Sequence, residues 1–236
     1  MNKSVKSIFA ALAVSAAATS YSQQAETACE TAVGWTPVAI GLASPVQLPW
    51  GLAKWDVYGL DLGLFYTDAP KMYGIDIAGL ASVTRCNLEG LQVSGLFNCG
   101  FDDVYGVRAT LGLNMCLKTV YGADFGLIGL RDRFVGLDAE FLGSAQHYAC
   151  GAQFAGLANV VDGEAWGCSI ALGANFARTL YGLQTAIVFN MAEELHGAQI
   201  GLVNFTDYCN NGFQIGLVNI ILSNQVKVLP IVNGRF

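Results

Sequence analysis

A polar side chain recurs every 14 to 16 residues along the chain, two positions after a glycine. Facing a water-filled lumen, these side chains would mildly favour cations, because carboxylates outnumber the single arginine. Facing a narrow interior, they would instead hydrogen-bond one another, with Arg108 paired to Asp124 or a neighbour. Both alternatives stay open. The candidate polar row, with one glutamate from a neighbouring position, is Asp61, Asp76, Gln92, Arg108, Asp124, Asp138, Glu140, Gln153, Ser169, Gln184, Gln199 and Gln214.

A serine and a histidine in the segment GSAQHYAC (residues 143–150) could carry out nucleophilic catalysis. Ser144 and His147 are three residues apart in a strand-rich region, however, so their side chains point to opposite faces. The sequence also lacks a GxSxG nucleophile elbow. We therefore predict no enzymatic activity and keep an outer-membrane lipid hydrolase as a remote alternative. His196 takes a position that tyrosine or tryptophan fills in other repeats, which favours an interfacial side chain.

Seven cysteines form no CxxC motif, so we predict neither a metal site nor a cofactor. Their odd number leaves at least one thiol without an internal partner. Cys99 and Cys116 follow successive repeats. Stacked coils would bring them within disulfide range, whereas an antiparallel meander would separate them by about 30 Å. The seven are Cys29, Cys86, Cys99, Cys116, Cys150, Cys168 and Cys209.

The polar row belongs to an internal repeat of eleven units, each with an anchor glycine. Positions one and three after the glycine are apolar, with Thr185 the only hydroxyl, and the position between them is polar. This period of two predicts one strand per unit, with an apolar face and a polar face. The remaining charges fall mainly between the units, including residues 131–133, where we expect turns. The anchors are Gly59, Gly74, Gly90, Gly106, Gly122, Gly136, Gly151, Gly167, Gly182, Gly197 and Gly212.

Two all-β architectures can use this repeat. In a parallel β-solenoid each unit is one coil, the apolar face fills a narrow core, and like residues stack into ladders. The identical phase of the units, including their GLxN asparagines, favours such stacking. In an up-and-down transmembrane barrel each unit is one antiparallel strand of about ten residues, apolar outside and polar inside. Aromatic residues before the anchor glycines would then form two interfacial girdles: Tyr58, Tyr73, Tyr105, Tyr121, Trp166 and Tyr181.

The composition favours the barrel. Only 13% of the residues are charged, 53% are hydrophobic, and the mean hydropathy is +0.44, which leaves little polar surface for a soluble rod. Residues 226–236 resemble the closing strand of bacterial outer-membrane barrels and bring the strand number to about twelve, an even number. With 12 basic and 18 acidic residues, a nucleic-acid partner is excluded. We therefore expect a transmembrane β-barrel, with the solenoid as the alternative.

The N-terminal residues predict export. Residues 1–22 combine Lys3 and Lys6 with a short apolar stretch and small residues before Gln23, the pattern of a signal peptide. Residues 23–57 contain prolines that disfavour regular strand pairing, so we interpret them as a cap or plug. Residues 58–236 form the β-repeat domain with its closing strand.

The tandem GLQxGLxN units resemble those of a bacterial surface-repeat family of secreted Gram-negative proteins. The clearest units are residues 197–204 (GAQIGLVN) and 212–219 (GFQIGLVN), and the motifs PVQL and LPIVN resemble the family's ends. The similarity covers most of the mature chain, although residues 136–143 (GLDAEFLG) lack both the glutamine and the asparagine. The resemblance implies a surface-exposed or outer-membrane location, and the family has no established enzymatic role.

Together these observations predict an exported outer-membrane or surface protein that is structural or pore-forming, with the lipid bilayer as its partner. The alternative function is a soluble or surface-attached β-solenoid that serves as an interaction scaffold. The sequence names no ligand or protein partner.

Overall fold

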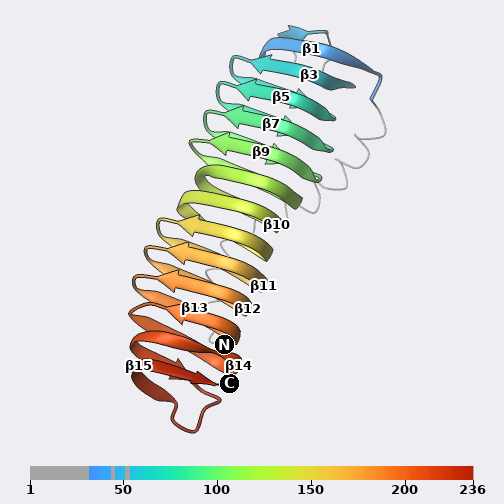
Figure 1. Cartoon of the computed structure of the whole chain (residues 1–236). Coiled ribbons are helices and arrows are strands. Elements are labelled where there is room, and N and C mark those ends of the chain that lie inside the picture. The colour runs from blue at the N-terminus through green and yellow to red at the C-terminus, as the bar shows by residue number, and fades with distance from the viewer. Residues whose placement is uncertain (1–31, 44–45, 51–53, 236) are drawn as a thin grey trace, which may run out of the picture.

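The chain folds as a parallel β-solenoid, a rod of stacked coils (Figure 1). The computed structural model describes residues 32–43, 46–50 and 54–235. In this part of the chain, no helix is long and hydrophobic enough to cross a bilayer. Each 14- to 16-residue repeat of the sequence is one coil, so residues at equivalent repeat positions lie beside one another along the rod.

The described residues form fifteen strands, and those from β10 onward run through some of the turns that separate the shorter strands. In the N-terminal coils each coil contributes two strands, because the chain bends between them. The strands are β1 Gly34–Ala43, β2 Val46–Leu48, β3 Trp55–Gly63, β4 Tyr66–Ala69, β5 Met72–Ala78, β6 Ala81–Thr84, β7 Leu88–Ser94, β8 Phe97–Gly100, β9 Val104–Thr110, β10 Leu113–Ala155, β11 Ala158–Ala171, β12 Ala174–Ala186, β13 Phe189–Ile200, β14 Val203–Ile221 and β15 Val228–Arg235.

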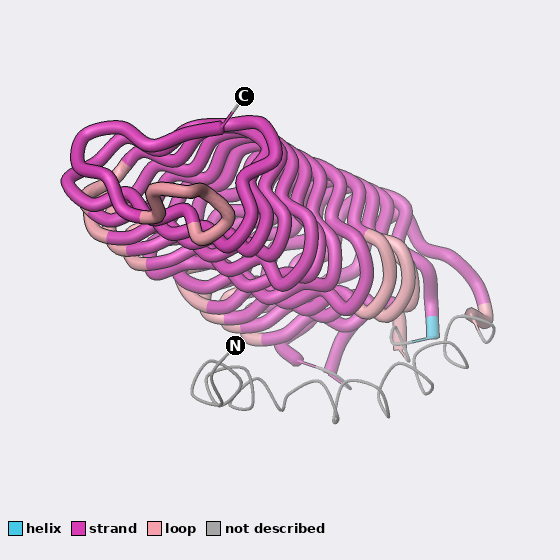
Figure 2. Tube along the Cα trace, turned by 90° about the horizontal axis from the view of Figure 1, so that it is seen from below, coloured by secondary structure: helices cyan, strands magenta, loops and turns pink. Residues whose placement is uncertain are grey.

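Two parallel sheets run along the rod. Figure 2 shows each coil as a flattened loop, and the two long sides of the loop belong to the two sheets. In the first sheet, which contains the anchor glycines, β3, β5, β7 and β9 stack in parallel and continue into β10. In the second sheet, β4, β6 and β8 stack in the same way and also continue into β10. Each coil therefore has two turns, one at each edge of the flattened loop.

The anchor glycines form an unbroken ladder in the first sheet. Gly90 pairs with Gly74 on one side and with Gly106 on the other. Gly106 has a φ of +144°, and a Cβ there would overlap the carbonyl oxygen of Gly90. Only glycine combines this backbone conformation with such a close approach. This requirement explains why glycine marks every repeat.

The interior of the coils has an apolar column and a polar column. The apolar column lies two positions before the anchor glycines, except at Gly212, and includes Val57, Met72, Leu88 and Val104, all at most 1% exposed. The candidate polar row lies two positions after the glycine and is also buried. Alternation along the strand then directs the apolar residues one and three positions after the glycine outward. Ile75 and Ile77, for example, are each 43% exposed.

Antiparallel strands cover both ends of the rod. At the N-terminal end, β1 pairs in parallel with β3 and β2 pairs antiparallel with β1, so residues of the predicted cap or plug segment form the first coil. At the C-terminal end, β15 pairs antiparallel with β14. The predicted signal peptide, residues 1–22, lies outside the described residues.

The prediction of a transmembrane β-barrel is wrong. A barrel of this type needs antiparallel neighbours, whereas successive repeats pair in parallel and in register, for example Asp61 with Asp76 and Gly59 with Gly74. Residues 226–236 contain a strand, but β15 caps the rod and closes no barrel. The aromatic residues before the anchor glycines form a single row on the first sheet instead of two girdles.

The prediction of which face fills the core of a solenoid is also wrong. We expected the apolar face to fill the core, but the polar row points inward and the apolar face points outward. The preference for a barrel that rests on composition is wrong for this reason: a low charge is compatible with a rod that carries apolar side chains on its surface.

Candidate functional site

The polar row lines the narrow interior of the solenoid, where all twelve of its side chains are buried. In the C-terminal coils its members hydrogen-bond one another along the rod. The hydroxyl of Ser169 donates to Gln153 Oε1 at 2.8 Å, and Gln214 Nε2 donates to Gln199 Oε1 at 2.8 Å. Gln199 Nε2 in turn donates to Gln184 Oε1 at 3.0 Å. These side chains hold neighbouring coils together and line no lumen.

A second polar ladder consists of the asparagines of the GLxN motif, which the sequence analysis noted only for their phase. Asn175 Nδ2 donates to Asn190 Oδ1 at 3.1 Å and to the Thr185 carbonyl at 2.9 Å. Asn190 repeats this pattern toward Asn204 and Ile200. Because each amide reaches both the next asparagine and the backbone of the next coil, the ladder joins successive turns. Its members are Asn98, Asn114, Asn159, Asn175, Asn190, Asn204 and Asn219.

A buried charged cluster interrupts the asparagine ladder in the middle of the rod. Arg108 forms a bidentate pair with Asp124, with Nε to Oδ1 at 2.8 Å and Nη2 to Oδ2 at 2.6 Å. Arg131 lies 2.7 Å from Asp124, 2.9 Å from Asp138 and 3.2 Å from Glu140. All five side chains have no exposed surface. Their charges therefore compensate one another within the interior.

Arg131 corrects the sequence analysis, which placed residues 131–133 in a turn. It occupies the next inward position after the ladder position, the place that Cys116 has one coil earlier. The equivalent inward residues of the other coils are uncharged. Following the alternation of inward and outward residues through the second strand of each coil would have identified Arg131 as buried. Asp132 and Arg133 are exposed, as expected for a turn.

The cluster contains three carboxyl groups and two guanidinium groups. Burial would raise the pKa of Asp124, but Arg108 and Arg131 outweigh it and hold this pKa below its ordinary value. Burial raises the pKa of Glu140 to about 8, although Arg131 opposes the shift. Burial also raises the pKa of Asp138, although Arg131 opposes the shift, so folding favours the neutral form of these two carboxyl groups.

The N-terminal coils bury two further members of the polar row. Burial, together with the nearby charges of Asp76 and Asp68, raises the pKa of Asp61 to about 7. Burial likewise raises the pKa of Asp76 to about 6, although hydrogen bonds from Ser82 and other neighbours oppose this shift. In the described residues, histidine, cysteine, aspartate and glutamate side chains form no group of three that could hold a metal ion.

The two residues weighed for nucleophilic catalysis lie on opposite sides of the coil wall. Ser144 is buried and its hydroxyl donates to Asn159 Oδ1 at 3.2 Å, which makes it part of the asparagine ladder. His147 is exposed at the outer surface. The histidine therefore faces away from the hydroxyl that it would have to activate.

The cysteines of successive coils are offset by one residue. Cys99 pairs with Met115, and Cys116 pairs with Gly100. Because alternate residues face opposite sides of a strand, the two thiols point in opposite directions, and both are free. The expectation that stacking would bring them within disulfide range is wrong. Burial raises the pKa of Cys99 to about 12, which leaves this thiol unreactive at neutral pH.

The turn from the first sheet to the second sheet carries exposed apolar side chains in coil after coil. We call these residues the apolar edge. Their exposed fractions run from 45% to 83%. The period of two within the strands does not distinguish this turn as a separate surface. The apolar edge comprises Leu64, Leu80, Leu96, Leu111, Phe141, Leu157, Leu172, Ile187, Leu202 and Leu217.

Both sheets continue the apolar surface on either side of the edge. The apolar band, as we define it, has three parts. These are the apolar edge, the outward residues one and three positions after the anchor glycines, and the residues on either side of the ladder asparagines. Between Ile75 and Ile220 this band contains no charged side chain, and Thr185 is its only side chain with an oxygen or nitrogen. Apart from Cys99, its side chains are half-buried or exposed.

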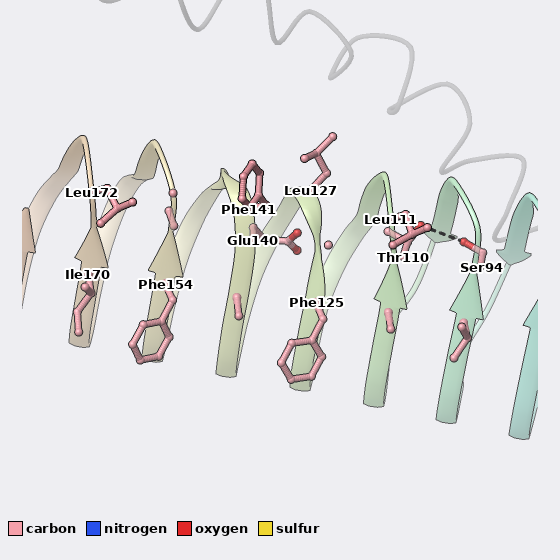
Figure 3. A pocket seen from close by; sticks show the side chains of 16 residues that line it. Ser94, Thr110, Leu111, Phe125, Leu127, Glu140, Phe141, Phe154, Ile170 and Leu172 are labelled. Atoms are coloured by element: carbon pink, nitrogen blue, oxygen red, sulfur yellow. Dashed lines mark hydrogen bonds between the residues drawn. The ribbon is translucent and has the colours of Figure 1, made fainter.

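A groove of about 870 Å³ follows the band in the middle of the rod (Figure 3). Figure 3 shows Phe125 and Phe154 on one side of it and Leu127 and Phe141 on the other. The groove forms because the third position after the glycine alternates between large and small side chains, with Ala139 between the two phenylalanines. Its lining is mainly apolar, with Ser94, Thr110 and Glu140 as the polar residues, so it fits a hydrocarbon chain better than a polar ligand.

The predicted interfacial aromatic residues form a broken row on the first sheet, between the apolar band and the opposite turn. Tyr58 stacks on Tyr73 with ring centroids 4.7 Å apart, and Tyr105 stacks on Tyr121 at 4.9 Å. The third group is Trp166, Tyr181 and His196, with centroid separations of 4.0 Å and 4.6 Å. The row marks the boundary between the apolar band and the charged residues.

The turn from the second sheet back to the first sheet carries the exposed charges, and we call it the charged edge. Arg178 contacts Asp162 at 3.0 Å in the neighbouring coil, and Lys118 contacts Asp102 at 2.8 Å. These pairs are partly exposed and contribute little to stability. Their position separates the rod into one apolar side and one polar side.

Comparison of the chain with protein-family models, with curated proteins and with solved structures found no match. The resemblance to the surface-repeat family therefore stays a prediction.

Proposed function

We propose that the protein is an exported, non-catalytic β-solenoid scaffold that attaches to the cell surface or envelope through its apolar band. The observation that carries this proposal is the continuous band itself, which extends from Ile75 to Ile220 without a charged side chain. Soluble monomeric proteins rarely expose contiguous apolar patches larger than a few hundred Å². A surface of this extent is typical of an interaction site.

The polar groups of the interior support a structural role. The two ladders and the charged cluster direct their donors and acceptors toward neighbouring coils, where no substrate has access. The rod is therefore held together by polar interactions between neighbouring coils along much of its length, which suits a scaffold that presents one long surface. Export rests on the signal peptide predicted for residues 1–22.

Fractionation of bacteria that produce the full chain tests this proposal. We expect the mature protein to begin at Gln23 and to sediment with the envelope. The edge variant L157S/L172S/L202S/L217S removes exposed apolar side chains and should move the protein into the soluble exported fraction. The control variant D162S/R178S/E194S/D207S changes the same number of side chains at or beside the charged edge and should stay with the envelope.

Circular dichroism and thermal unfolding of both variants establish that they retain the β-fold. If the folded edge variant stays with the envelope as fully as the wild type, the apolar band is not the attachment surface and the proposed function is wrong. Cytoplasmic retention of the unprocessed chain would contradict export.

A further inference from the structure

We propose that the partner of the apolar band is a lipid bilayer, and that the rod lies in one leaflet with its axis parallel to the membrane. This inference rests on the proposed function and names the partner of the same surface. The band would insert among the acyl chains, the aromatic row would lie at the level of the headgroups, and the charged edge would remain in water.

The order of residues along one strand supports this orientation. In β11 and the turn that follows, the outward side chains are Glu164, Trp166, Cys168, Ile170 and Leu172. Polarity therefore falls in one direction, from a carboxylate through an aromatic ring to three apolar side chains. The indole nitrogen of Trp166 donates to Glu164 Oε2 at 3.0 Å, which turns the polar end of the ring toward the charged edge. Tryptophan and tyrosine take this amphipathic position at membrane interfaces.

The second sheet changes from apolar to charged in the same direction. After Phe176 its next outward residue is Arg178, after Met191 it is Glu193, and after Phe205 it is Asp207. Both faces of the rod therefore become polar on the side away from the apolar edge. A rod with this distribution of polarity can enter an apolar layer with its apolar edge first, and then neither sheet has to bury a charge.

The height of the band matches one leaflet. Cys168 and Leu172 are four residues apart, which corresponds to about 13 Å along an extended strand. Half of a hydrocarbon core of about 30 Å is about 15 Å. The band is thus deep enough to fill one leaflet and too short to span both.

The chemistry of the band favours lipid over a protein partner. Protein interfaces carry about one hydrogen bond per 100–200 Å². Between Ile75 and Ile220 only Thr185 could supply a side-chain hydrogen bond from the band. The band is also a convex ridge where two sheets meet, and a fluid hydrocarbon layer adapts to a ridge along its whole length. The groove beside Phe125, Ala139 and Phe154 would accommodate an individual acyl chain.

The charged edge predicts which lipids bind. Acidic residues outnumber basic residues there, so electrostatic attraction to anionic lipids is not expected. Binding should therefore occur with zwitterionic vesicles and should not depend on salt. The residues concerned are Lys71, Arg85, Glu89, Asp102, Asp103, Lys118, Asp132, Arg133, Asp162, Glu164, Arg178, Glu193, Glu194 and Asp207.

Flotation with phosphatidylcholine vesicles tests the inference. We expect the purified mature chain to float with the vesicles equally at 0.05 and 0.5 M NaCl, where screening differs strongly. The edge variant L157S/L172S/L202S/L217S should reduce the bound fraction by at least about tenfold. The control variant D162S/R178S/E194S/D207S should float like the wild type.

Quenching of tryptophan fluorescence by brominated lipids tests the orientation. In the variant W35F/W50F/W55F only Trp166 remains. We expect bromines close to the headgroup to quench Trp166 more strongly than bromines near the chain ends. Stronger quenching from the chain ends would overturn the proposed orientation.

Failure of the inference can be distinguished from failure of the proposed function. If the wild type does not float but forms a dimer that the edge variant loses, the band joins two copies of this chain, and the lipid inference is wrong. If the wild type neither floats nor dimerises while envelope attachment still requires the edge, the partner is a protein and the inference is again wrong. In both cases the band remains the docking surface of the proposed function.

Discussion

At the scale of single residues, Glu140 replaces a missing rung of the asparagine ladder. Gly129 takes the position of the asparagine in its coil, and Glu140 of the next coil reaches into that space. Its Oε1 accepts a hydrogen bond from Asn114 Nδ2 at 3.3 Å and lies 3.2 Å from Arg131. The substitution keeps the coils connected, but it brings a third carboxyl group into a cluster with two arginines.

This carboxyl group makes the stability of the fold depend on pH. Burial raises the pKa of Glu140 from 4.5 to about 8, so folding favours its neutral form. The contribution is fully present below about pH 4.5 and is lost as the pH rises through about 8. We expect the free energy of unfolding to fall over this range by on the order of 1 kcal/mol per pH unit.

The variant Glu140→Gln isolates this contribution, because glutamine is nearly isosteric and cannot titrate. Urea unfolding at pH 5 and pH 8 should show a smaller loss of stability in the variant than in the wild type. Asp61 and Asp76 also have a raised pKa and will keep part of the pH dependence. An unchanged difference between the two pH values would show that Glu140 does not titrate in this range.

At the scale of elements, the asparagine ladder joins neighbouring coils beside the apolar edge. The side chain of Asn175 accepts from Asn159, donates to Asn190 and donates to the Thr185 carbonyl. Three consecutive coils are thus joined by one amide. The apolar edge can be exposed without distorting the fold because polar interactions directly beneath it hold the coils together.

The variant Asn175→Ala should therefore destabilise the fold by about 2–4 kcal/mol, since it removes all four side-chain hydrogen bonds of this residue at once, including one to the Ser169 carbonyl. Equilibrium unfolding in urea measures this difference. Asn210 is a suitable control, because it is exposed and contacts only the ring nitrogen of His196 among its side-chain partners. Equal losses in Asn175→Ala and Asn210→Ala would contradict a structural role for the ladder.

At the scale of the whole molecule, β15 protects the C-terminal end of the rod. It pairs antiparallel with β14, from Gly212 with Arg235 to Ile220 with Val228, and covers backbone groups that another chain could bind. Exposed edge strands of this kind promote association between molecules. The terminal antiparallel strand thus limits the growth of an otherwise repetitive structure.

Removal of residues 226–236 should therefore cause end-to-end association. In a detergent that covers the apolar band, light scattering should show oligomers that grow with concentration for the truncated chain and a single species for the full chain. The variant Arg235→Ala keeps β15 and should behave like the full chain. A monodisperse truncated chain would show that β15 does not protect this end.

Much of the local structure follows from the residue pattern. The anchor glycines and the alternation of apolar and polar residues identified the repeat, the strands and the side chains that share a face. The pairing of Arg108 with Asp124 was one of the two alternatives for the polar row. Arg131 was missed because alternation was followed only through the strand with the anchor glycine.

The direction of strand pairing required the tertiary structure. A period of two is the same in parallel and antiparallel sheets, so Gly59 could neighbour Gly74 through a full coil or through a hairpin. The identical phase of the asparagines favours stacking, whereas the low charge favours a barrel in lipid.

The sequence by itself therefore determined the repeat and the composition of each face. Only the tertiary structure decided that these faces form a solenoid with a polar interior and an apolar edge, because that outcome depends on hydrogen bonds between residues about one coil apart, such as those from Asn175 to Asn190 and from Gln214 to Gln199.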